Sequence, residues 1–119
     1  MADILQQLRD AVSGLTYPSE SDEPFEVLKF GASFASAKAA VESVAPANAI
    51  AEVPMGKFFD DLADDPQIGR FRSLQKLIGE NLADATVFRV DRGSEIDVYL
   101  LGRVPVGEWA GVKTMSVET

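Results

Sequence analysis

Apolar side chains recur every three to four residues in several stretches of this 119-residue chain, the spacing typical of amphipathic helices. The clearest stretch follows Asp64-Asp65-Pro66, where Asp65 is expected to cap a helix that has proline at its first position. Shorter helices are predicted directly after Asp3, over residues 33–45 and around residues 55–62. The apolar face of the long helix, which is predicted to end near Leu82, consists of Ile68, Phe71, Leu74, Ile78 and Leu82.

The last third of the chain has a period of two, which predicts a meander of strands. These strands cover residues 86–90, a middle segment containing Ile96, Val98 and Leu100, and residues 109–117. Two earlier strands are predicted over residues 25–30 and 50–53. Helices before and between mainly antiparallel strands predict a single α+β domain over residues 1–119, with helices on both faces of the sheet.

Cysteine and histidine are both absent from the sequence. Their absence excludes disulfides, thiolate nucleophiles, the usual zinc sites and imidazole-dependent catalytic triads. Carboxylate or lysine chemistry stays formally possible, but we expect a protein that is not an enzyme, has no catalytic residues and needs no cofactor. The N-terminus has no secretory pattern and no segment is long and apolar enough to span a membrane, so we expect a cytoplasmic protein.

The chain carries 19 acidic and 11 basic residues, a formal charge of −8. This charge disfavours direct binding to nucleic acid, because phosphate groups are also anionic. It favours a basic protein partner, whose encounter would be accelerated by electrostatic attraction. The alternative is that the negative charge serves solubility alone.

Two acidic segments and the chain end are the candidate sites. Glu20, Asp22 and Glu23 form an acidic loop that could bind a cation, act in acid–base catalysis, contact a basic partner or be a solvated turn. The run Asp60, Asp61, Asp64 and Asp65 has the same alternatives, with helix capping as a further one. A last strand ending at Val117 leaves Glu118 and the terminal carboxylate of Thr119 beyond the sheet. Such a carboxylate could bind an arginine or a hydrated divalent cation, or belong to a mobile end.

Short segments spread over the chain match one known family: Ile4-Leu5-Gln6-Gln7-Leu8, Gly14-Leu15, Ser19-Glu20-Ser21, Pro24-Phe25-Glu26-Val27, Phe58-Phe59, Phe71, Leu74-Gln75-Lys76-Leu77 and Asn81-Leu82. The match is densest near the end: Asp97-Val98-Tyr99, Gly102, Pro105, Gly107, Ala110-Gly111 and Val117-Glu118-Thr119. On these segments the chain resembles the nuclease A inhibitor family over nearly its full length, most weakly over residues 32–55.

The resemblance implies a three-layer α-β-α sandwich with a central, mainly antiparallel sheet. It also implies stoichiometric inhibition of a sugar-non-specific, metal-dependent endonuclease with a ββα-metal active site. Such an inhibitor would form a one-to-one complex, bind no nucleic acid itself and be a monomer when free.

By position in the family pattern, Thr119 would offer its terminal carboxylate to the water shell of the nuclease's metal ion. Glu20 would face an arginine of the nuclease, and Glu118, Asp64 and Asp65 would add contacts. The chain would hold no metal of its own. One departure is that residues 62–68 are shorter than the acidic-aromatic contact segment of the family and contain no aromatic residue, which leaves the choice of nuclease open.

Two other functions remain possible. The same scaffold could be a non-enzymatic interaction or regulatory module with a partner that is not a nuclease. A carboxylate-based hydrolase using Glu20, Asp22 and Glu23 would need a metal ion or a substrate cleft that the sequence does not indicate.

Overall fold

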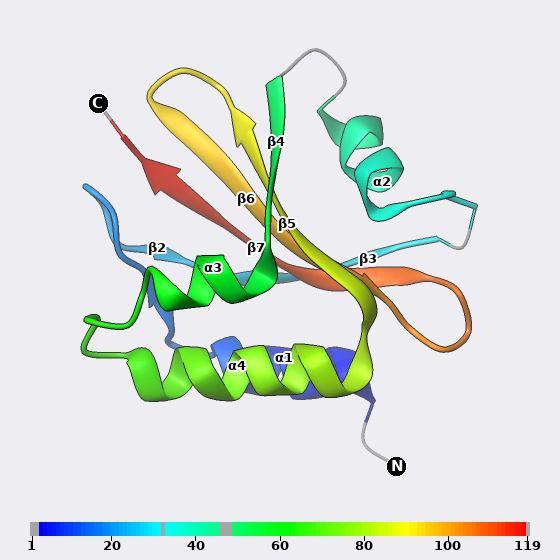
Figure 1. Ribbon diagram of the computed structural model, residues 1–119, viewed down its shortest axis with the longest axis horizontal. Helices are drawn as coiled ribbons and strands as arrows, with labels where there is room; N and C mark the ends of the chain where they lie inside the picture. Colours follow the sequence, from blue (N-terminus) through cyan, green and yellow to red (C-terminus); the bar gives the residue numbers. More distant parts are fainter. Residues whose placement is uncertain (1–2, 32, 46–48, 119) are drawn as a thin grey trace.

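A five-stranded antiparallel sheet forms the centre of the computed structural model, which describes residues 3–31, 33–45 and 49–118 (Figure 1). Neighbouring strands follow the order β3-β7-β6-β5-β4. The bounds of the five strands are β3 Glu26–Phe30, β4 Ala49–Val53, β5 Ala83–Asp91, β6 Glu95–Arg103 and β7 Trp109–Val117. The predicted meander is thus confirmed: β7 has the predicted bounds, and β5 extends beyond the predicted residues 86–90 at both ends.

The middle strand β6 is buried on both faces, as its sequence predicts. Val98 and Leu100 pack into one apolar core, whereas Tyr99 and Leu101 pack into a second core on the opposite face. Successive side chains of a strand point to opposite faces. The sheet therefore separates two cores, and both need a cover.

Three helices cover the first face: α1 Ile4–Val12, α3 Met55–Asp60 and α4 Ile68–Asn81. Phe71, Leu74 and Ile78 of α4 are fully buried there, as the helical spacing predicts. The helix α2, Ala37–Val44, packs on the second face against Phe88 and Trp109. The α+β class is confirmed, and the three-layer sandwich stays a prediction. No helix in the described ranges is both long and apolar enough to span a membrane.

Two predicted helix starts are wrong. Helix α4 begins at Ile68 with Gln67 as its N-cap, not after Asp65. The carboxylate of Asp65 instead accepts a hydrogen bond of 2.7 Å from the backbone N–H of Gln67 in the preceding turn. Helix α2 begins at Ala37 rather than residue 33, because the hydroxyl of Ser36 caps it. Val44, the last residue of α2, is 56% exposed.

A second, two-stranded sheet was not predicted. It pairs β1, Thr16–Tyr17, with β2, Glu23–Pro24. The hydroxyl of Thr114 on β7 donates to the carbonyl of Pro24 over 3.0 Å. This small sheet therefore brings the acidic loop between β1 and β2 to the C-terminal end of β7 (Figure 1).

Candidate functional site

Glu20 lies beside the last residues of β7. Its backbone N–H donates to the carbonyl of Val117 over 3.2 Å, and the N–H of Val117 donates to the hydroxyl of Ser19 over 3.1 Å. Ser19 also closes its own loop, because its hydroxyl donates to the carbonyl of Ser21 over 2.6 Å. The structure thus brings together Glu20 and the C-terminal segment, two features predicted from distant parts of the sequence. Thr119 lies outside the described residues.

Glu118 is held by both its backbone and its side chain. Its N–H donates to the carbonyl of Ser94, in the turn between β5 and β6, over 2.7 Å. Its carboxylate accepts hydrogen bonds from the hydroxyl of Ser116 over 2.7 Å and from the guanidinium of Arg89 over 2.6 Å. The hydrogen bond from the Ser116 hydroxyl lowers the pKa of Glu118 most, and the hydrogen bond from the Arg89 guanidinium lowers it further. The carboxylate therefore stays ionised in the folded protein.

Tyr17 lies between this end of the sheet and helix α3. Its ring stacks on that of Phe58, with centroids 5.6 Å apart and planes inclined by 10°. Burial raises the pKa of its phenol, which also lies close enough to Arg89 and Glu118 to be affected by their charges. An open pocket of about 370 Å³ lies here, and it is lined by Tyr17, Pro18, Ser19, Glu20, Ser116, Val117 and Glu118.

Asp64 and Asp65 lie in the loop between α3 and α4. This loop is on the same side of the molecule as the C-terminal end of β7 (Figure 1). Asp64 is exposed and Asp65 is half-buried. The side-chain amide of Gln67 anchors this loop by donating to the carbonyl of Thr16 over 3.0 Å. The loop therefore reaches the neighbourhood of Tyr17 through β1. Asp60 and Asp61, by contrast, form surface ion pairs with Arg72 and Lys57.

The acidic residues do not form a ready-made cation site in the described parts of the chain, where no three potential metal ligands lie together. Glu23 accepts a hydrogen bond from the hydroxyl of Ser21 over 3.2 Å, and Asp22 is exposed. Calcium or magnesium needs several converging oxygen ligands. The loop is better suited to present carboxylates outwards than to enclose an ion.

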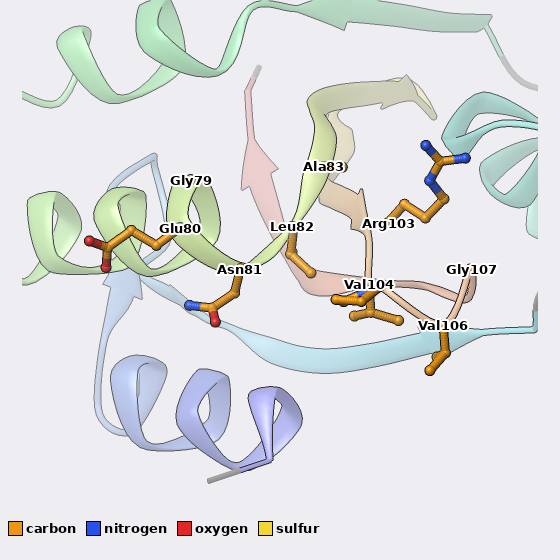
Figure 2. Close-up of a pocket in the computed structure, with 10 residues that line it drawn as sticks. Gly79, Glu80, Asn81, Leu82, Ala83, Arg103, Val104, Val106 and Gly107 are labelled. Atoms are coloured by element: carbon orange, nitrogen blue, oxygen red, sulfur yellow. The ribbon is translucent and has the colours of Figure 1, made fainter. Parts of the chain in front are cut away.

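A larger pocket, of about 560 Å³, lies between the C-terminal end of α4 and the β6–β7 turn, lined by residues 79–83 and 103–107. Figure 2 shows that the charged side chains of Glu80 and Arg103 point in different directions around it. Arg103 forms an ion pair with Asp84 over 3.2 Å. Because polar groups do not converge there, the carboxylates at the opposite end of β6 remain the candidate functional site.

Sequence reasoning missed Arg89 and Ser116. Arg89 interrupts a buried strand, and its alternation with Val87 places it on the face that the helices cover. A charged residue on a covered face needs a partner, and this is the signal that could have found it. Its partner, Glu118, directly follows β7, and β6 lies between β7 and β5 in the sheet. The sequence alone does not reveal this strand order.

Comparison with known proteins identifies a matching family. A family model described as nuclease A inhibitor-like protein matches residues 2–119, which include the loop carrying Glu20 and the whole C-terminal segment. No curated protein matches the chain.

Proposed function

Because the chain belongs to the nuclease A inhibitor-like family, we propose that it inhibits a sugar-non-specific, metal-dependent endonuclease by occupying the active site with carboxylates. Family membership itself supports an inhibitor-type role, a non-catalytic protein and a nuclease partner in general. The proposal adds the class of nuclease, a one-to-one complex and the contact residues. Glu20 would pair with an arginine of the nuclease, and the terminal carboxylate of Thr119 would face its hydrated metal ion.

The observation that carries the proposal is the direct bonding between the Glu20 loop and the end of β7. The backbone N–H of Val117 donates to the hydroxyl of Ser19, and the backbone N–H of Glu20 donates to the carbonyl of Val117. These bonds join the two segments that would carry the anionic groups, so less conformational entropy is lost when the segments bind a partner. A nuclease that holds phosphate with basic residues and a divalent cation would attract both groups.

The other predicted contacts would have smaller parts. Asp64 is exposed in a loop anchored beside β1, so it would contribute at the rim of the interface, with Asp65 next to it. Rim charges act mainly on the rate of encounter. The carboxylate of Glu118 is already hydrogen-bonded within the chain.

The test is a titration of the purified protein, with its C-terminus unmodified, into a ββα-metal endonuclease that degrades DNA in the presence of Mg²⁺. Nuclease activity should disappear at one equivalent. Glu20→Gln should weaken inhibition by about 30-fold or more, because it leaves a buried arginine of the partner unpaired. Glu42→Gln is the matched control, since Glu42 is an exposed acid on α2, over the other face of the sheet.

A second variant carries a few extra residues after Thr119, which removes the carboxylate from that position, and it should lose inhibition. Undiminished nuclease activity at a large excess of the unmodified protein would overturn the proposal. The interaction module with a different partner would then be the better explanation, favoured by the lack of an aromatic residue in the loop before α4. A screen for metal-dependent hydrolysis by the protein alone tests the carboxylate hydrolase.

A further inference from the structure

We propose that Arg89 is a positioning residue, whose ion pair with Glu118 fixes the direction in which the chain leaves β7 and so presents the terminal carboxylate to the partner. The positioning role rests on the proposed function. The clamp itself, meaning the contacts of Arg89, Ser116 and Ser94 with Glu118, is a property of the free protein and can be tested without a nuclease.

The position of Arg89 explains why a long side chain is needed. Arg89 pairs with Val98 in the register of β5 and β6, and Val98 pairs with Thr114 in the register of β6 and β7. Its side chain must therefore cross the width of β6 to reach the end of β7. Adjacent strands lie about 4.8 Å apart, so only a long side chain can span this distance. The side chain of Arg89 is 29% exposed and its ion pair with Glu118 has an N···O distance of 2.6 Å.

The remaining contacts fix Glu118 from other directions. Ser116, which is 2% exposed, donates its hydroxyl to the same carboxylate oxygen that Arg89 binds. The backbone N–H of Glu118 is bonded to the carbonyl of Ser94. Chain ends ordinarily fray unless they are tied down. A half-exposed ion pair contributes little to global stability, so its main consequence is local order at the chain end.

This arrangement also reassigns Glu118. Its carboxylate serves to hold the chain end instead of acting as a ligand for the partner. Glu118→Gln should then impair the protein in the same way as Arg89→Gln, and the two substitutions together should have no larger effect than either alone.

The first experiment measures the release of C-terminal residues from the intact protein by a carboxypeptidase, relative to release from a peptide of residues 113–119. Arg89→Gln and Glu118→Gln should each raise the release rate by about tenfold, because digestion of a chain end follows its local opening. Arg89→Lys keeps the charge and should restore part of the protection. Arg103→Gln is the matched control, since it breaks an exposed ion pair with Asp84 at the other end of β6. Thermal unfolding checks that every variant is folded.

The second experiment measures inhibition of the endonuclease by the same variants. Arg89→Gln should weaken inhibition by about tenfold, and the same substitution in the C-terminally extended protein should cause no further loss. Release that is unchanged in Arg89→Gln would overturn the clamp. Raised release with unchanged inhibition would overturn the positioning role. If the unmodified protein inhibits no nuclease but Arg89→Gln still raises release, the clamp stands and the proposed function fails with the positioning role.

Discussion

The ionised carboxylate of Glu118 makes local stability dependent on pH. Hydrogen bonds from Ser116, the larger cause, and from Arg89 lower its pKa from the ordinary value of 4.5. A depressed pKa in the folded state stabilises folding above the unfolded value, and this contribution disappears as the pH falls through the folded value. The stabilisation from Glu118 should therefore be complete above about pH 4.5 and lost progressively below it.

The comparison of wild type with Glu118→Gln isolates this contribution from that of the other carboxylates. Near pH 7 the variant should unfold at slightly lower urea concentration, by less than about 1 kcal/mol because the pair is half-exposed. The difference should shrink as the pH falls below about 4.5. A difference that stays constant from neutral to acid pH would mean that the ionised pair contributes nothing.

At the scale of single elements, β7 contains a glycine, Gly111, that lies too close to the neighbouring strand β6 to be replaced by a larger residue. A Cβ at Gly111 would lie 2.8 Å from the carbonyl carbon of Leu100 and 3.0 Å from the Cα of Leu101. Both atoms belong to the backbone of β6, which cannot move without disturbing the centre of the sheet. Gly111→Ala should therefore lower the free energy of unfolding by about 3 kcal/mol, as measured by urea denaturation.

Gly79→Ala is the matched control for this prediction. Gly79 is exposed in α4, and a Cβ there would meet nothing within 4 Å. Alanine should raise the free energy of unfolding by about 0.5–1 kcal/mol, because it restricts the unfolded chain and favours the helix. Equal effects of the two substitutions would show that the close approach of β6 and β7 is not what requires glycine.

The sequence predicts well those elements in which the spacing of apolar residues determines which side chains are buried. The apolar face of α4 and the alternation in β6 are examples. The start of α4 could not be predicted in this way. Asp65 and Pro66 are a strong local signal, but the side chain of Gln67 bonds to Thr16, 51 residues away, and the helix begins after it. The strands β1 and β2 have two residues each, so they are too short to show an alternation of apolar and polar residues.

At the scale of the whole molecule, the candidate site could be predicted only as separate pieces. The acidity of the loop at Glu20 and the strand leading to Glu118 are visible in the sequence. Their proximity depends on a hydrogen bond between Ser19 and Val117, which are 98 residues apart. The contribution of Arg89 depends in addition on the strand order of the sheet. Family resemblance supplied Glu20 and Thr119, and their roles stay predictions.

The formal charge of −8 makes a prediction about the kinetics of complex formation with a basic nuclease. Opposite charges accelerate encounter, and salt screens this attraction over about 10 Å at 0.1 M. Asp64→Asn, at the exposed rim, should lower the association rate constant and leave dissociation nearly unchanged, whereas Glu20→Gln should mainly accelerate dissociation. Stopped-flow measurements from about 20 to 200 mM salt should show slower association with rising salt, and a smaller salt dependence for Asp64→Asn. Association that is independent of salt would mean that the acidic surface does not steer the partner, and the negative charge would then be explained by solubility alone.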